Sequence, residues 1–271
     1  MTLPVFLADD LTPALESLSV GDSATLGGAE GRHAASVRRI GAGEWVDVVD
    51  GCGLRATCEV SGSDKSSLSL VVREITQEEA PSPEVILVQA LAKGGRDEAA
   101  VEICTEIGID RVIPWASQRA IVQWKGLKAE KGRAKWESVA RAAAKQSRRA
   151  FVPVVEGVKD SRELASWLAS LTDEAGVAFV CHEEATDSLG VALALVQQSR
   201  ADGSLPASIA LIVGPEGGIG PEETAQLVEA GARTIGLGDN VLRSSTAGAV
   251  ALTLIRAAAG AYQFRSVQLW K

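Results

Sequence analysis

The chain has 271 residues, of which 46% are hydrophobic and 23% are charged, and its net charge is −8. This composition excludes a wholly disordered protein, and no apolar run reaches the roughly 18 residues that a membrane-spanning helix needs. The net negative charge also argues against a protein that coats nucleic acid without selection.

Cysteine and histidine usage argues against a metal centre. The chain has two histidines and four cysteines, none in a CxxC pair: Cys52, Cys58, Cys104 and Cys181. A histidine-rich metal site is excluded, and a zinc site or disulfide framework is disfavoured. The first residues include Asp9 and Asp10 but no basic residue, unlike a signal peptide. We therefore expect a cytoplasmic protein without a metal and without a membrane partner.

Residues 1–76 are expected to form a small β-barrel domain. Short, partly alternating runs at 44–50, 54–60 and 68–75 predict strands, with glycine-containing turns between them. A helix-like segment between residues 30 and 40 carries four basic side chains: Arg32, His33, Arg38 and Arg39. Residues 77–83 are polar and contain two prolines, which predicts a linker.

Residues 84–271 are expected to form an α/β domain. Strands are predicted at 85–90, 111–114, 176–181, 208–213 and 234–237. Helices are predicted at 96–107, 135–149, 221–230 and 247–260. Because strands and helices alternate, we expect a mostly parallel sheet.

Three loops of unusual composition follow predicted strands, at 181–184, 214–220 and 236–247. Ligands of open α/β sheets bind at the carboxyl ends of strands, so these loops predict a binding site. The second loop, GPEGGIG, is neither a dinucleotide fingerprint nor a P-loop. Its Glu216 would repel a phosphate, which favours a cofactor without phosphates. Taken alone, this loop is equally compatible with a tight structural turn.

Arg243 stands among apolar and small polar residues in the third loop. A buried, unpaired arginine is costly, so we expect it to meet an acid or an anionic ligand. The hydroxyls of Ser244–Thr246 have a simpler explanation as helix caps.

The segment 119–149 contains ten basic and two acidic residues, which leaves the rest of the chain at −16. Arg141, Lys145 and Arg148 share one face of the predicted helix. Glu137 lies four residues before Arg141, but no acid lies four residues from Lys145 or Arg148, so the interpretation we favour is phosphate binding rather than a solvated surface.

Four ordered motifs resemble the RsmE family of SPOUT-superfamily methyltransferases. The most specific is GPEGGIGPEE followed by IGLGDNVLRSSTA, in residues 214–223 and 235–247. The others are RHAASVRR at 32–39, ALAKGGRDEAAVEICTEIGIDRVIPWASQRA at 90–120, and KWESVARAAAKQSRRAFVP at 135–153. The resemblance extends over nearly the whole chain.

The resemblance implies a PUA-like β-barrel, an α/β domain with a deep trefoil knot, and a homodimer. The implied activity is methyl transfer from S-adenosylmethionine to N3 of a uridine in 16S ribosomal RNA, in the assembled small subunit, with Arg243 as the catalytic residue. No general base stands out; His182 and Glu183 are candidates. The implied cofactor-binding residues are Cys181, His182, Glu183, Val213, Gly214, Pro215, Glu216, Gly217, Gly218, Leu237, Gly238, Val241, Leu242, Ser244, Ser245 and Ala247. The implied RNA-binding residues are Arg32, His33, Arg38, Arg39, Lys93, Arg96, Arg141, Lys145, Arg148 and Arg149.

The chain departs from the family pattern at several positions. Arg32 replaces a histidine, Ala92 a proline, Lys145 a glutamate, and Ser245 an acid beside Arg243. Two alternatives stay open: the same fold with another RNA substrate, such as transfer RNA or a ribose hydroxyl, and a non-enzymatic RNA-binding assembly factor. A nicotinamide-linked dehydrogenase is more distant, since the chain lacks its glycine fingerprint.

Overall fold

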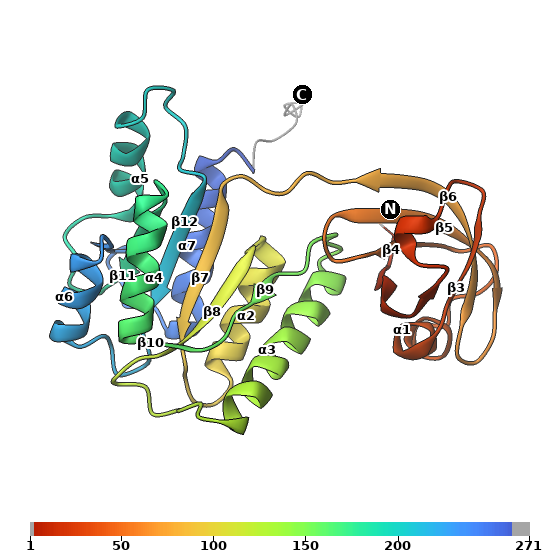
Figure 1. Cartoon of the computed structure of the whole chain (residues 1–271), viewed down its shortest axis with the longest axis horizontal. Coiled ribbons are helices and arrows are strands. Elements are labelled where there is room, and N and C mark those ends of the chain that lie inside the picture. Colours follow the sequence, from red (N-terminus) through yellow and green to blue (C-terminus); the bar gives the residue numbers. More distant parts are fainter. Residues whose placement is uncertain (1–2, 262–271) are drawn as a thin grey trace, which may run out of the picture. The chain divides into compact units, whose positions relative to one another are not determined.

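The computed structural model describes residues 3–261, which divide into two units (Figure 1). The barrel unit contains residues 3–80 and 140–152, and the α/β unit contains 81–139 and 153–261. The boundary after residue 80 lies inside the segment expected as a linker. The sequence analysis did not predict that residues 140–152 belong to the barrel unit, because it divided the chain into contiguous segments only.

The barrel unit contains a six-stranded sheet in the order β1-β4-β5-β6-β3-β2. All pairs are antiparallel except β1 with β4. Alternate residues of β5 and β6 enter its core, as the sequence pattern predicts. A short helix, α1 (Gly28–Arg32), continues into one π-helical turn at His33–Val37. The strands are β1 (Val5–Leu7), β2 (Leu11–Thr12), β3 (Ser23–Leu26), β4 (Trp45–Val49), β5 (Leu54–Ser63) and β6 (Leu68–Gln77).

The α/β unit contains a parallel sheet in the order β10-β8-β7-β12-β11-β13, with β9 beside β8. Every strand pair in it is parallel, which confirms the α/β prediction. The trefoil knot stays a prediction. The strands are β7 (Glu84–Ala90), β8 (Arg111–Ala116), β9 (Val154–Val155), β10 (Lys159–Asp160), β11 (Val177–Cys181), β12 (Ser208–Val213) and β13 (Arg233–Ile235).

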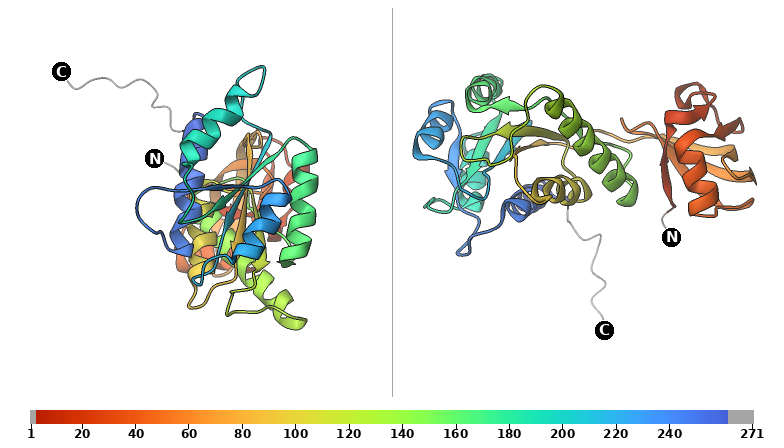
Figure 2. Two further views of the ribbon diagram at one scale, coloured as in Figure 1. Left: turned by 90° about the vertical axis from the view of Figure 1, so that its left-hand side faces the viewer. Right: turned by 90° about the horizontal axis from the view of Figure 1, so that it is seen from below.

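Helices lie on both faces of this sheet (Figures 1 and 2). Leucines of α4 and α6 share one core with the sheet, whereas α2 and α7 pack against each other. Helix α2 spans the predicted residues and ends at Gly108, whose φ of +116° suits a glycine cap. The helices are α2 (Arg96–Ile107), α3 (Leu127–Gln146), α4 (Ser161–Asp173), α5 (Leu189–Gln198), α6 (Pro221–Glu229) and α7 (Ser244–Ala258).

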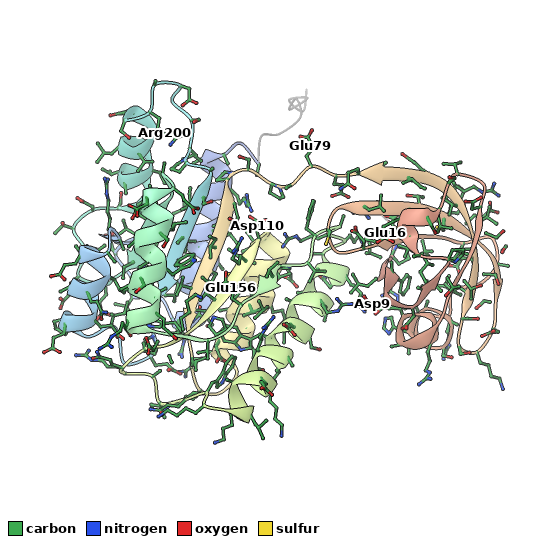
Figure 3. All side chains as sticks on the ribbon, viewed as in Figure 1. Asp9, Glu16, Glu79, Asp110, Glu156 and Arg200 are labelled. Carbon is green, nitrogen blue, oxygen red and sulfur yellow. The ribbon has the colours of Figure 1, made fainter. Side chains whose placement is uncertain are left out.

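Helix α7 is held to the sheet by Arg256, whose side chain is buried. Its guanidinium donates to the carbonyl oxygens of Gly108 and Pro83 and pairs with Asp110, which is labelled in Figure 3. A buried arginine needs such complete pairing. These contacts therefore fix the helix that begins at the strand-end loops. None of the helices in the described part of the chain has the length and apolarity to cross a membrane.

Candidate functional site

A cavity of about 900 Å³ opens at the carboxyl ends of β11, β12 and β13. This volume is ample for a small-molecule ligand. Its walls come from the three loops singled out in the sequence, together with Arg119 from the loop after β8 and residues of α6 and α7. The parallel sheet brings these loops to one edge, as expected for strands that all point the same way.

Most of the expected cofactor-binding residues line this cavity; Pro215 and Ser245 do not. Arg243 is also absent from the lining. Its side chain is exposed, contrary to the buried position expected, although its neighbours Leu242 and Ser244 line the cavity. The lining residues that sequence reasoning missed include Arg119, Thr224, Ala225 and Val228, whereas Glu184, Asp239 and Asn240 belong to the predicted loops. The predicted strand 111–114 was a usable signal for Arg119, because its following loop lies at the same sheet edge.

The GPEGG loop folds back tightly on itself. A Cβ at Gly214 would lie 2.6 Å from Ile219 Cγ1, and Gly218 has a φ of +70°. The Gly218 N–H donates to the Pro215 carbonyl oxygen at 3.0 Å. Glycine at 214 and 218 therefore lets the backbone itself form this wall of the cavity.

Glu216 ties the GPEGG loop to the loop before α2. Its Oε1 accepts from the Lys93 N–H at 3.2 Å and from Arg96 Nη1 at 2.9 Å. Burial opposes ionisation, but hydrogen bonds from its own N–H, from Lys93 and from Arg96 outweigh it, so the pKa of Glu216 is lowered. Glu216 is therefore a carboxylate at neutral pH, and the charge of Arg96 is already satisfied.

A buried polar network anchors the loop that carries Arg119. The fully buried Glu223 accepts from the Gln118 N–H at 3.0 Å and from Ser161 Oγ, which itself accepts from Trp115 Nε1 at 3.1 Å. Arg119 Nη1 then donates to the Gly217 carbonyl oxygen at 3.2 Å. The loop after β8 is thus fixed against the GPEGG loop.

Two buried hydroxyls at the cavity have no hydrogen-bond partner within residues 3–261. Ser244 Oγ and Thr224 Oγ1 both belong to residues that line it. Helix α7 has no side-chain cap, so the capping role expected for Ser244 is not realised. Buried hydroxyls of this kind are normally satisfied, so they are suited to a polar ligand.

The charges that line the cavity suit a positively charged ligand without phosphates. Glu183, Glu184, Glu216 and Asp239 are acidic, and Arg119 is the sole arginine or lysine among the described lining residues. Burial raises the pKa of the Cys181 thiol to about 12, so it is a neutral thiol rather than a nucleophilic thiolate. The Glu184 N–H donates to His182 Nδ1 at 3.2 Å, which places the proton of a neutral imidazole on Nε2.

The expected RNA-binding residues fall into two groups. Arg96, Arg141 and Lys145 form ion pairs with Glu216, Asp9 and Glu30, respectively; Asp9 is labelled in Figure 3. Arg149 is half-buried. The exposed residues without an ion pair among the described residues are Arg32, His33, Arg38, Arg39, Lys93 and Arg148. The side chains of this second group are therefore the ones that no carboxylate of the described residues pairs with.

Comparisons with known proteins agree with this architecture. The family model described as an RNA methyltransferase domain matches residues 78–256, and an RNA methyltransferase PUA domain matches 26–73. The ribosomal RNA small subunit methyltransferase E of Mycobacterium tuberculosis is 41% identical, over 86% of this chain and 85% of that protein. The protein of the same name from Bacillus subtilis is 32% identical, over 84% and 87%.

Solved structures show the same fold. A ribosomal RNA small subunit methyltransferase E from Neisseria gonorrhoeae, bound to S-adenosyl methionine, has a TM-score of 0.78 at 25% identity, over 95% of this chain and 98% of that one. The fold and the matched domains define an RNA methyltransferase with a PUA-like N-terminal domain. At these identities and coverages, the chain belongs to the ribosomal RNA small subunit methyltransferase E family, as its motifs indicate.

Proposed function

We propose that this chain is an S-adenosylmethionine-dependent methyltransferase that modifies N3 of one uridine in 16S ribosomal RNA. The observation that carries the proposal is the cavity at the ends of β11, β12 and β13. Its acidic lining complements the sulfonium and ammonium groups of the cofactor, and Ser244 and Thr224 offer unsatisfied hydroxyls. Its closely folded glycine loop would hold such a cofactor by backbone groups.

S-adenosylmethionine, when bound, supplies an electrophilic methyl group. Residues of the chain would hold the cofactor and the target base in line, which removes much of the entropic cost of their meeting. The uridine must be unpaired or flipped, because N3–H takes part in Watson–Crick pairing. Loss of that proton leaves negative charge on the flanking carbonyl oxygens. Arg243, exposed beside the cavity and without an ion-pair partner among the described residues, is the candidate to stabilise it.

The proton acceptor is proposed to be Glu183 rather than His182. Glu183 is exposed and lines the cavity. His182 already accepts at Nδ1 from the Glu184 N–H, so its Nε2 carries the proton when the ring is neutral. This assignment rests on the hydrogen-bond geometry.

The partner RNA would also contact the barrel unit. Arg32, His33, Arg38 and Arg39 are exposed on α1 and the turn that follows it, and none has an ion-pair partner among the described residues. Contacts of this kind position RNA phosphates without reading sequence. We propose the 16S RNA of the assembled small subunit as the substrate and the cytoplasm as the place of action.

A homodimer is the proposed oligomeric state. Helices α5 and α7 pack against each other and expose large apolar side chains: Val191 (52% exposed), Leu195 (51%) and Leu254 (43%). A second copy of the chain would cover this surface. Sedimentation of the purified protein should give the mass of two chains, whereas a monomer at micromolar concentration would contradict the dimer.

The experiment uses small ribosomal subunits from cells that lack the protein. They are incubated with the purified chain and isotopically labelled S-adenosylmethionine, and the digested RNA is examined by mass spectrometry. Label in 3-methyluridine at one site is the expected result. Label in another nucleoside would favour the alternative RNA substrates, and the absence of both label and cofactor binding would favour the assembly factor.

The role of Arg243 is tested by Arg243→Ala. Turnover should fall by a factor of about 100, which corresponds to about 3 kcal/mol of lost electrostatic stabilisation. Affinity for S-adenosylmethionine, measured by calorimetry, should stay the same because Arg243 does not line the cavity. The matched control is Arg162→Ala, since Arg162 is an exposed arginine on α4. Unchanged turnover of the Arg243 variant would remove the assignment.

A further inference from the structure

At its beginning, the basic segment 119–149 has four cations without an ion-pair partner among the described residues. Arg119, Lys125, Lys128 and Lys131 are exposed, and no carboxylate of the described residues lies within ion-pair distance of them. Further along α3, most of the charge is already used. Arg133 pairs with Glu137, Lys135 with Glu98, Arg141 with Asp9 and Lys145 with Glu30. Apart from Arg148, the exposed cations of this segment without an ion pair therefore lie before α3 and in its first turns, within the α/β unit.

These lysines are placed where they disfavour the helix. Lys128 and Lys131 lie in the first turns of α3, where the helix dipole favours anions, and Glu130 is the one acid in the first turn. Cations at a helix N-terminus lower its stability by a few tenths of a kcal/mol. Neither lysine forms an ion pair among the described residues, whereas a bound anion would offset this cost.

The loop before α3 is held in a fixed arrangement by Trp124. A Cβ at Gly132 would lie 2.3 Å from Trp124 Cε2, so the indole occupies the space of the missing side chain. The Trp124 ring also meets Trp136 edge-on, with centroids 5.1 Å apart. Glycine inside a helix costs about 1 kcal/mol relative to alanine. Helix α3 begins at Leu127, earlier than the sequence pattern predicted, and the Trp124 indole packs against it at Gly132.

Apolar side chains are interleaved with the cations. Ile121 is 69% exposed and Leu127 is 73% exposed. At the other end of the loop, Arg119 lines the cavity and bonds to Gly217 of the GPEGG loop. The loop between β8 and α3 thus runs from the cavity to the start of α3 (Figure 1). A basic path with exposed apolar groups is suited to single-stranded nucleic acid, in which both phosphates and bases are accessible.

We propose that Arg119, Lys125, Lys128 and Lys131, with Ile121 and Leu127, form an entry track for the single-stranded RNA next to the target nucleotide. The lysines bind successive phosphates, the apolar side chains contact the unstacked bases, and Arg119 receives the backbone at the mouth of the cavity. The proposal rests on the proposed function of that cavity. It moves the RNA contact of the basic segment from Arg141 and Lys145 to its other end.

The test measures RNA binding directly. Affinity of the full chain for a fluorescein-labelled single-stranded oligouridylate is measured by anisotropy at several salt concentrations. In Lys128→Ala/Lys131→Ala, the negative slope of log K against log salt should become shallower by about 1.4, because each lost contact to a single-strand phosphate removes about 0.7 from its magnitude. The control, Arg162→Ala/Arg233→Ala, removes the same charge from exposed arginines outside the track and should keep the wild-type slope.

Three outcomes would overturn the entry track. The first is an unchanged slope in the lysine variant, and the second is an equal change in the control, which would mean that net charge alone attracts the RNA. A change in sedimentation of the lysine variant would instead indicate that the surface contacts a second copy of the chain, and would also overturn it. If the methyl-transfer assay fails but the lysine variant changes the salt slope as expected, the proposed function is rejected and the entry track is not.

Discussion

The two ends of helix α3 carry similar side chains in opposite states. Lys128 and Lys131, at its beginning, are exposed and have no ion-pair partner among the described residues. Arg141 and Lys145, near its end, pair with Asp9 and Glu30. The first pair belongs to the α/β unit and the second to the barrel unit. A high density of positive charge in a sequence therefore does not show which charges are available to RNA.

The difference arises because acids distant in sequence reach one end of the helix. Glu30 is a buried acid whose Oε2 also accepts from the Leu7 N–H. It therefore needs a cation, and Lys145 supplies it from 115 residues away. No acid of the described residues approaches Lys128 or Lys131 in this way. The comparison separates charge that stabilises the fold from charge that is free to bind.

The largest effect on stability is expected for Lys145→Met. The variant leaves Glu30 buried without its cation, and the free energy of unfolding should fall by about 2 to 3 kcal/mol, below the full cost for a completely buried pair. Chemical denaturation measures this change. The double variant Glu30→Gln/Lys145→Met should recover most of the loss. If the free energy of unfolding of Lys145→Met equals that of the wild type, the cations at the two ends of α3 do not differ in their role in the fold.

A smaller loss is expected for Ser161→Ala. This change leaves the buried Trp115 N–H unpaired and removes one donor from Glu223, which should cost about 1 to 2 kcal/mol of unfolding free energy. Because Glu223 also accepts from the Gln118 N–H beside Arg119, the affinity for S-adenosylmethionine should fall too. Ser166→Ala, at an exposed serine of the same helix, is the control. Normal stability with normal cofactor affinity would show that the network does not hold the start of the track.

Arg141→Ala should lower stability by only about 0.5 kcal/mol. Its pair with Asp9 is largely exposed, and solvent screens such pairs. RNA affinity should stay near that of the wild type, because the charge of Arg141 is already neutralised. A clear drop in the salt slope of oligouridylate binding would contradict this and would restore a role in RNA binding to the end of α3.

The smallest stability effect, and the opposite sign, is expected for Lys128→Glu. A carboxylate in the first turn complements the helix dipole, so the unfolding free energy should rise by about 0.3 to 0.5 kcal/mol. RNA affinity should nevertheless fall, since a phosphate contact is replaced by repulsion. Thermal denaturation and anisotropy measure the two quantities in one preparation. Joint loss of stability and affinity would mean that Lys128 supports the fold.

Local patterns predicted the elements well where a clear period coincided with a cap. Helix α2 begins at Arg96 and ends before Gly108, and strand β12 covers residues 208–213, both as expected. Helices α4 and α5 were not predicted, although α4 has a capping box between Asp160 and Glu163. Helix α3 begins at Leu127 rather than at residue 135. Gly132 lies inside it, where the Trp124 indole occupies the space that a side chain would need.

The parallel α/β sheet and the three loops that line the cavity could be predicted from the sequence, because the alternation of strands and helices and the composition of loops are local patterns. The exposure of Arg243, the position of Arg119 at the cavity and the pairing of each cation on α3 could be seen only in the folded chain. These depend on contacts between residues far apart in the chain, such as Lys145 with Glu30 and Gln118 with Glu223. The packing of the chain selects which acid meets which base, and no local pattern records that choice.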